Sequence, residues 1–526
     1  MINFNKEICI IGSGPTAVSL IKAFTKNSEN IKITVITTGS FEYLNKFDLI
    51  KNKIKKLDKK KKYEYWFKSF LSRDTLVPKK LYFNDVDIYG QKKSFIFDKK
   101  KINFDLSYQI GGLTNVWGGN VSNLSKNDFD KYNYEDFKFK KYTKEISKDL
   151  NINGKNDDID YDNQLSYSAN RLEYSSQAKF LVKNYYENLP FFKKKKFRIG
   201  FAKLAINTVE EVNKCENCGL CMFGCHKDSI YSASNFFKIK EKKYNLIDCH
   251  KVVEVNDHNN RVILKIQNEN NHKFSKKEFD KVIFASGTME TSAIIIKFLK
   301  KKYDKIKLTI KDSTKYFFLF YTKKKIYNEH LNTVGLSQNF IQTEIKSHTF
   351  HIQLYDSNIL IKMILRKFLK NKLIDNLFSL FNFFFDRLMV GVVYFPSEIS
   401  DSFSLDYNLN SFRLTINKNN KNKFNKFFIL LYIKLVSLFT KLKSFPLPLF
   451  LKGKVGISQH FGSSLPLKKN PKLGECYING KLYGANNIYI ADTSSLTRIP
   501  STPTTLLTMC HARRIAENIL LELNKK

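Results

Sequence analysis

Four cysteines stand close together in the middle of the chain, in the run CENCGLCMFGCHKD. Cys215, Cys218, Cys221 and Cys225 follow the spacing C-x-x-C-x-x-C-x-x-x-C. Thiolates are ligands of iron–sulfur clusters and of structural zinc, and a dense run of them in a reducing compartment favours metal or redox chemistry over disulfides. The four side chains are therefore candidate metal ligands.

Three interpretations of this run stay open. The spacing is that of bacterial ferredoxin loops, which predicts a 4Fe–4S cluster. Only one such run is present, and His226 stands where those loops have a proline. A single cluster would need Cys225, or a remote residue such as Cys249 or Cys476, as its fourth ligand. The second interpretation is zinc, although zinc sites usually use two separated cysteine pairs. The third is that the thiols bind no metal.

A glycine turn near the N-terminus, in KEICIIGSGPTAVSLIKAF, predicts dinucleotide binding. An apolar strand precedes Gly12, Gly14 and Ala17, and a helical pattern follows. Gly12 permits a tight turn, Gly14 lets backbone N–H groups approach a pyrophosphate, and Ala17 allows close packing of helix and strand. The second strand, KITVIT, leads to Thr37 where an acidic residue usually holds the ribose, so the threonine hydroxyl is the candidate for that contact.

Three later segments also carry candidate chemistry. The loop YQIGGLTNVWGGN has two Gly-Gly pairs around a tryptophan, which suits a backbone that passes close to a flat ligand. FDKVIFASGTMETSAIIIKFL repeats the order of strand, glycine turn and helix. The C-terminal part holds His460 in SQHFGSS and a strand, NIYIAD, that ends at Asp492. Because the pKa of a histidine lies near neutral pH, His460 is a candidate base.

In this order the four segments resemble the glucose–methanol–choline (GMC) family of flavin oxidoreductases, of the type with a ferredoxin-like cysteine cluster. The resemblance implies an α/β fold, with a Rossmann-like FAD-binding domain and a second α+β substrate domain built on an antiparallel sheet. The matching residues are Gly12, Gly14, Ala17, Gly111, Gly112, Thr114, Trp117, Gly118, Gly119, Ala285, Gly287, Thr291, His460, Gly484, Asn487, Ile488, Asp492 and Ser494.

The resemblance also implies bound FAD. Some relatives attach the flavin through a histidine beside the loop tryptophan, and Val116 stands there in this chain, so we predict noncovalent FAD. The predicted FAD-binding residues are Gly12, Gly14, Ala17, Thr37, Gly111, Gly112, Thr114, Asn115, Trp117, Gly118, Val253, Gly287 and Asp492.

For the reaction, the resemblance implies oxidation of an alcohol by hydride transfer to the flavin, with His460 as the base. The family usually has a second histidine or an asparagine where this chain has Thr502, which we predict to orient the substrate. We expect a dehydrogenase acting on a sugar or polyol, with the electron acceptor left open. The alternatives are a long-chain or lipid-linked alcohol as substrate, or a catalytically weak flavin-fold protein that binds a partner.

The four segments predict a discontinuous FAD-binding domain over residues 1–125, 240–300 and 450–526. The substrate domain is predicted over 126–239 and 301–449 and includes the cysteine cluster. Its strands are expected at TKYFFLFYT and LMVGVVYF. Residues 361–388 and 424–444, rich in Phe, Leu and Lys, are expected to be helical.

The chain of 526 residues carries a formal net charge of +40, with lysines spread along its whole length. No basic stripe with interleaved aromatic residues stands out, so we expect no nucleic-acid partner. The apolar stretch 427–440 is interrupted by Lys434 and is shorter than the roughly 20 residues needed to span a bilayer. It predicts a buried or an interfacial helix, and with the charge it suggests peripheral membrane association. The N-terminus has no signal-peptide pattern, so we expect a cytoplasmic protein, at the inner face of the membrane if the association holds.

Overall fold

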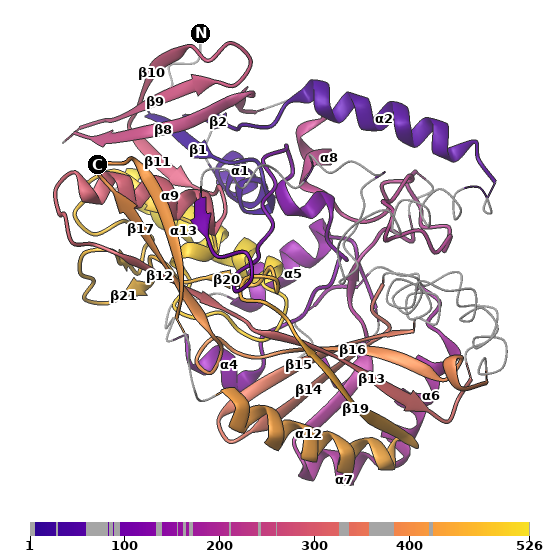
Figure 1. The fold of residues 1–526 in the computed structure, drawn as a ribbon. Helices are drawn as coiled ribbons and strands as arrows, with labels where there is room; N and C mark the ends of the chain where they lie inside the picture. The colour runs from indigo at the N-terminus through magenta and orange to yellow at the C-terminus, as the bar shows by residue number, and fades with distance from the viewer. Residues whose placement is uncertain are drawn as a thin grey trace.

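The computed structural model describes residues 6–27, 30–58, 61, 83, 88, 95–132, 139–154, 156–160, 165–167, 172–209, 212–239, 243–258, 260–325, 336–356, 383–419 and 424–524. Figure 1 shows a parallel sheet in the upper half of the molecule and an antiparallel sheet in the lower half. The predicted fold class, an α/β arrangement with a second antiparallel part, is confirmed.

The parallel sheet consists of short apolar strands from distant parts of the chain. Its order is β23-β11-β1-β2-β7, and β1 pairs in parallel with β2 on one side and with β11 on the other. Most residues of β1, β2, β11 and β23 are buried, as expected for a parallel sheet covered on both faces, whereas the edge strand β7 has no buried residue. The strands are β1 (Lys6–Ile11), β2 (Ile31–Ile36), β7 (Asn245–Ile247), β11 (Lys281–Phe284) and β23 (Ile488–Ile490).

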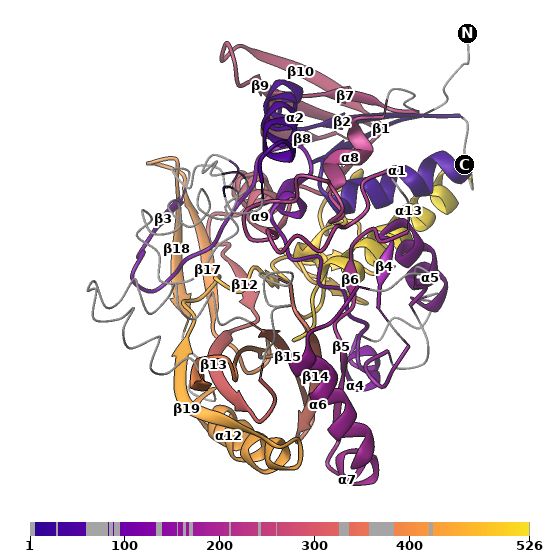
Figure 2. The same cartoon turned by 90° about the vertical axis from the view of Figure 1, so that its right-hand side faces the viewer.

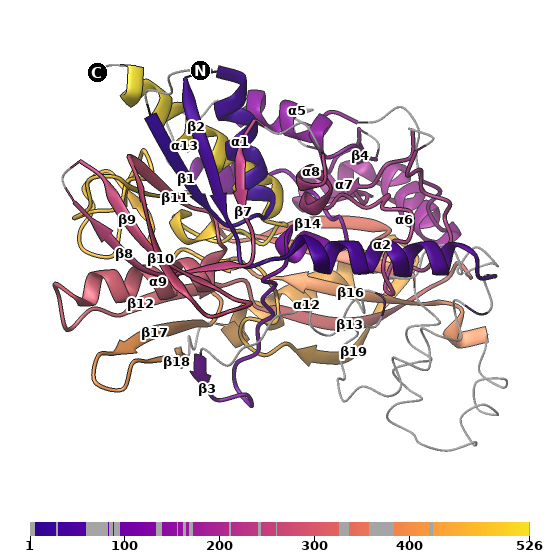
Figure 3. The same ribbon diagram turned by 90° about the horizontal axis from the view of Figure 1, so that it is seen from above.

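Each face of the parallel sheet has its own cover. Helices α1 (Pro15–Asn27) and α13 (Thr505–Asn524) pack against one face, where Ile8 and Ile10 meet Val18 and Ile515. Helix α9 (Thr288–Lys300) and the antiparallel sheet β10-β9-β8 cover the other face. Figure 2 shows α1 and α13 below β1 and β2, with β9 and β10 above them, and Figure 3 shows the same elements from above. The three strands are β8 (His250–Asp257), β9 (Val262–Asn268) and β10 (Phe274–Phe279).

The lower half is a six-stranded antiparallel sheet in the order β19-β13-β16-β15-β14-β5. Two of its strands, β13 and β16, lie where the sequence predicted them. Helix α12 (Phe424–Lys441) covers one face, and Figure 2 shows it below β13 and β19. The strands are β19 (Ser444–Lys452), β13 (Lys315–Thr322), β16 (Leu388–Tyr394), β15 (His348–Asp356), β14 (Asn339–Ile345) and β5 (Phe197–Phe201).

Helix α12 confirms the helix predicted at 424–444, and it is a core helix. Leu431, Leu435, Leu438 and Phe439 are each at most 2% exposed and pack against the sheet. No helix within the described residues combines the length and the apolar character needed to cross a membrane. Most of the other predicted helix, 361–388, lies outside the described residues.

A third sheet, in the order β20-β12-β17-β18-β3, connects the two halves. Strand β12 ends at Asp312 and β13 begins at Lys315, so the chain passes between sheets within two residues. The strands are β20 (Phe461–Gly462), β12 (Leu308–Asp312), β17 (Ser402–Asn408), β18 (Arg413–Asn419) and β3 (Phe95–Phe97). The other elements include α2 (Phe41–Lys55), η4 (Gly112–Asn115), α4 (Lys126–Asp130), α5 (Phe139–Asp149), α6 (Ser176–Glu187), α7 (Leu189–Lys194), α8 (Ala233–Phe237) and η7 (Thr493–Ser495).

Candidate active site

A cavity of about 910 Å³ lies between the parallel sheet and the six-stranded sheet. Its wall begins at the glycine turn after β1, passes His460, and continues along β13, β16 and β19. The volume falls in the range of ordinary cofactor and ligand pockets. Segments that are far apart in the sequence therefore meet around one space.

The first glycine turn fits its predicted role. Gly12 has a φ of +112°, and a Cβ there would lie 2.4 Å from the carbonyl oxygen of Ala285, so only glycine fits. A Cβ at Gly14 would meet no atom within 4 Å, and Gly14 lines the cavity at the start of α1. Ala17 does not line the cavity and lies fully buried in the core between α1 and the sheet.

The tryptophan loop forms the adjacent wall. Gly112, Thr114, Trp117 and Gly118, all predicted FAD-binding residues, line the cavity. The indole Nε1 of Trp117 donates a hydrogen bond to the carbonyl oxygen of Tyr231 over 2.7 Å, which fixes the ring. The loop is therefore held from outside while its backbone follows the cavity.

Two other residues of this loop, Gly111 and Asn115, were also predicted to bind FAD, but they lie behind the cavity wall. Asn115 donates from Nδ2 to the carbonyl oxygen of Ile110 and accepts from the Ser232 hydroxyl. Gly111 has a φ of +96°, and a Cβ there would lie 2.6 Å from Oδ1 of Asn115. Neither residue lines the cavity, so both shape the loop.

The third turn and Asp492 meet at the same place. Gly287 lines the cavity with open space at its Cα. Asp492 accepts hydrogen bonds from the Gly287 N–H at 2.9 Å, from the Thr291 hydroxyl at 2.5 Å and from the Ser494 N–H at 2.9 Å. Burial raises the pKa of its carboxyl, although these hydrogen bonds oppose the shift. Asp492 therefore ties two strand ends together at the cavity edge.

These observations test whether the residues fit FAD. Gly14, Gly112 and Gly287 expose their backbone to the same cavity. A Cβ at Gly14 or Gly287 would project into open space. The first turn of α1, at Pro15 and Thr16, lines the same space, and a helix N-terminus is the usual site of a pyrophosphate. The residues fit an elongated, phosphate-bearing flat ligand such as FAD.

The threonine predicted to hold the ribose already has a partner. Thr37 lines the cavity, and its hydroxyl lies 2.8 Å from the Ser13 hydroxyl. Glu290, which the sequence reasoning missed, lines the same end of the cavity and accepts a hydrogen bond from the Tyr108 hydroxyl at 2.5 Å. Val253 does not line the cavity, although its neighbour Val252 does, and the pairing of β8 with β9 shifts in register between Val252 and Glu254.

His460 lies on the cavity wall just before β20. Its ring stacks on Tyr394, with the ring centroids 4.7 Å apart, and its Nδ1 is buried with no hydrogen-bond partner among the described residues. Burial, followed by the charge of nearby Lys315, lowers the pKa of His460 to about 3. The imidazole is therefore neutral at neutral pH.

A buried carboxyl group holds the backbone around His460. Asp312 is fully buried and accepts from the Ser458 hydroxyl at 2.6 Å and from the Gly456 N–H at 2.8 Å. The Ser458 oxygen in turn accepts from the His460 N–H at 2.9 Å. Burial raises the pKa of Asp312 to about 6. The Asp312 carboxyl group therefore reaches the His460 backbone through the Ser458 hydroxyl.

Thr502 lies behind the cavity wall. It is fully buried, its hydroxyl has no hydrogen-bond partner among the described residues, and it is absent from the cavity lining, whereas Pro503 and Thr504 line it. Its predicted role of orienting the substrate stays a prediction.

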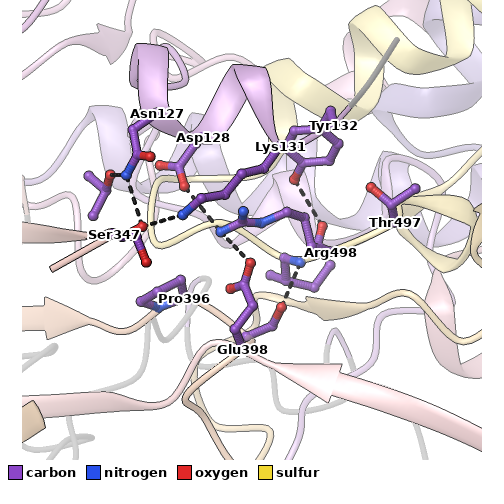
Figure 4. Close-up of polar contacts among 12 residues, drawn as sticks. Asn127, Asp128, Lys131, Tyr132, Ser347, Pro396, Glu398, Thr497 and Arg498 are labelled. Atoms are coloured by element: carbon purple, nitrogen blue, oxygen red, sulfur yellow. Dashed lines mark hydrogen bonds and ion pairs between the residues drawn. The ribbon is translucent and has the colours of Figure 1, made fainter.

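An ion-pair cluster fixes the loop that leads to Thr502 (Figure 4). Arg498 lies 3.2 Å from Asp128 of α4 and 2.5 Å from Glu398, which precedes β17. The Tyr132 hydroxyl donates to the carbonyl oxygen of Arg498 over 2.9 Å. Three distant segments therefore meet at one guanidinium group.

The cysteine loop lies beside the cavity. Met222, between two of the cysteines, lines the cavity, while Cys215, Cys221 and Cys225 pack against an apolar cluster that Trp117 also contacts. Burial raises the pKa of the Cys215 thiol to about 11.

The structure does not assemble these cysteines into a metal centre. Within the described residues, which include all four cysteines, no group of three or more His, Cys, Asp or Glu side chains is placed to hold a metal ion. Cys225 accepts a hydrogen bond from the Ser229 N–H, and Cys215 lies near the Asn217 amide oxygen. The 4Fe–4S and zinc predictions therefore find no support in the structure.

The sequence reasoning missed a second histidine beside the site. His351 of β15 is fully buried, lies opposite Tyr394 in the strand register, and neither of its ring nitrogens has a hydrogen-bond partner among the described residues. Burial lowers its pKa to about 3. No local signal marks it, because only the pairing of β15 with β16 brings it to Tyr394.

Comparison with known proteins shows the fold. No family model matches the sequence, and no curated protein matches it. Among solved structures, the crystal structure of pyridoxine 4-oxidase from Mesorbium loti aligns with a TM-score of 0.58 and 9% sequence identity, over 98% of this chain and 99% of that chain. The chain therefore has, over almost its whole length, the fold of that oxidase.

Proposed function

We propose that the protein is a FAD-dependent oxidoreductase of GMC type that oxidises an alcohol. The proposal rests on one observation. A single cavity is lined by three glycine turns, at Gly14, Gly112 and Gly287, and by His460, which is buried and neutral. The fold shared with an oxidase supports the same conclusion. The site fits a reaction in which a flat cofactor and a proton acceptor contact the same small molecule.

The proposal gives the residues of the site separate roles in cofactor binding and in proton transfer. When bound, FAD supplies the acceptor for the hydride and its electron pair, which leave the alcohol carbon. The chain supplies the other half of the oxidation, because His460 takes the hydroxyl proton as the carbonyl group forms. The backbone around Gly14, Gly112 and Gly287 binds the cofactor, and Asp492 fixes two of its strand ends.

The first prediction concerns His460. The purified protein should be yellow, and an alcohol substrate should bleach the flavin absorption in the absence of oxygen. His460→Ala should keep the colour and lose the bleaching by at least about a hundredfold, the usual size of a general-base contribution. His351→Ala is the control, because His351 is buried beside the site and does not line the cavity. A colourless protein, or normal bleaching in His460→Ala, would contradict the proposal.

The electron acceptor and the cysteine loop are part of the same test. Hydrogen peroxide formed in air would identify an oxidase, whereas turnover only with an added dye would identify a dehydrogenase. The position of Met222 on the cavity wall supports a link between the cysteine loop and the cofactor. Anaerobic purification with iron and zinc analysis and EPR tests the predicted 4Fe–4S cluster.

A further inference from the structure

The cavity continues past His460 along one face of the six-stranded sheet. On β13, Phe317, Phe318 and Leu319 line the cavity, whereas Phe320 packs toward α12. Val390 and Val392 of β16 line it beside them. Beyond His460 the wall along β13 and β16 is therefore mostly apolar, and Lys315, Tyr394 and Gln353 are polar side chains that line the cavity nearer to His460.

The amide groups on this wall are already in contact with one another. The Gln353 side-chain oxygen accepts from Asn120 Nδ2 at 3.0 Å and from the Tyr355 hydroxyl at 2.8 Å. The Ser337 hydroxyl donates to the Asn120 side-chain oxygen. A sugar carries a hydroxyl on almost every carbon, and each one that is buried without a partner weakens binding. With these amides engaged, the part of the wall along Phe317 and Leu319 offers few partners to a polyol.

The outer end of the cavity is apolar as well. Leu449 and Leu451 of β19 line it, yet they are 61% and 49% exposed. Large apolar side chains at the mouth of a ligand pocket favour a ligand that is itself apolar where it leaves the protein.

We infer that the substrate is a long-chain primary alcohol. Its hydroxyl lies at His460, its tail lies along Phe317 and Leu319, and the end of the tail passes between Leu449 and Leu451. The inference rests on the proposed function and specifies its substrate class. It also selects the lipid alcohol over the sugar predicted from the sequence.

The expected signature is a dependence on chain length. Burying one methylene group is worth roughly 0.8 kcal/mol, which corresponds to about a fourfold change in affinity. Across ethanol, butanol, hexanol, octanol and decanol, kcat/KM for anaerobic flavin bleaching should rise by about two- to fourfold per methylene. Glucose and mannitol should bleach far more slowly than octanol.

A binding measurement separates this inference from the proposed function. Calorimetric titration of the FAD-loaded protein should detect octanol and not mannitol. Bleaching by sugars or short alcohols with no rise along the series would overturn the substrate class and leave the proposed function standing. If no alcohol bleaches the flavin, the proposed function and the inferred substrate class fail together.

A pair of matched variants locates the tail. Leu449→Ser should lower kcat/KM for decanol by about fivefold or more and leave that for butanol unchanged, because only the longer tail reaches the mouth. Ile433→Ser is the control, since Ile433 is also 61% exposed but lies on α12 and does not line the cavity. Equal losses for both alcohols, or equal effects of the two variants, would overturn the placement of the tail.

Discussion

At the scale of single residues, Asp312 is a buried acid that holds the segment before His460. Its pKa rises from the usual 3.8 to about 6 because burial disfavours the charged form. The folded chain therefore binds a proton more tightly than the unfolded chain between these two values. This contribution to stability is complete below the unfolded pKa of 3.8 and is lost as the pH rises through about 6.

Asp312→Asn tests this linkage. The free energy of unfolding of the wild type, measured relative to the variant, should fall between pH 3.8 and about 6, by at most about 1.4 kcal/mol per pH unit. Asparagine keeps one acceptor oxygen for Ser458, so His460 should still support bleaching. Urea unfolding curves at several pH values give the difference, and a constant difference across this range would contradict the assignment.

Single residues also mark what the sequence could predict. Gly12, Gly14 and His460 were found because each belongs to a local pattern whose geometry a few neighbouring residues determine. Lys315 and Gln353 line the same cavity and were missed. Their placement depends on which strands pair and in which register. The alternation of apolar and polar residues along a single strand does not contain this information.

At the scale of elements, the Arg498 cluster joins α4, the segment before β17 and the loop before α13. Asp128 is fully buried, and burial raises the pKa of its carboxyl even though the charge of Arg498 opposes the shift. The charged form of Asp128 at this buried position is stabilised by the charge of Arg498. The loop that carries Pro503 and Thr504 to the cavity therefore depends on one buried ion pair.

Arg498→Met should lower the free energy of unfolding by about 3–5 kcal/mol, because it leaves Asp128 buried without its cation. Adding Asp128→Leu to this variant should restore most of the loss, since the uncompensated charge is then gone. Urea unfolding measures both. A double variant as unstable as Arg498→Met alone would show that the ion pair is not the source of the effect.

The elements predicted best from the sequence were those with the strongest local pattern. Strands β13 and β16 and helix α12 were found from apolar runs of the right length. The cysteine loop was not, because spacing along the chain does not fix where four sulfurs point. Backbone contacts such as that of the Cys215 N–H to the Asn207 carbonyl oxygen set the path of the loop.

At the scale of the whole molecule, the net charge of +40 and the exposed face of α12 bear on the predicted membrane association. Leu431 lies in the core, at 1% exposed, so it has no part in a surface. Ile429 and Ile433 are 57% and 61% exposed on the same helix, between the exposed Lys426 and Lys441. If the protein binds a lipid surface through this helix, these isoleucines make the contact.

Flotation with vesicles that contain anionic lipid tests this association. The wild type should float, and it should do so less at high salt, because lysine contacts with anionic lipid are screened. Ile429→Asp with Ile433→Asp should abolish flotation and leave flavin binding intact. A wild type that stays at the bottom of the gradient would rule out the association.

Strand β19 forms one edge of the six-stranded sheet and carries the leucines of the cavity mouth. An edge with exposed Leu and Phe side chains is the kind of surface on which a second copy of a chain adds as a further strand and begins to aggregate. Pro446 and Pro448 interrupt the row of N–H donors along this edge, and the register with β13 shifts nearby. The two prolines therefore allow an apolar cavity mouth at this edge without a continuous row of N–H donors to which a strand of another copy could pair.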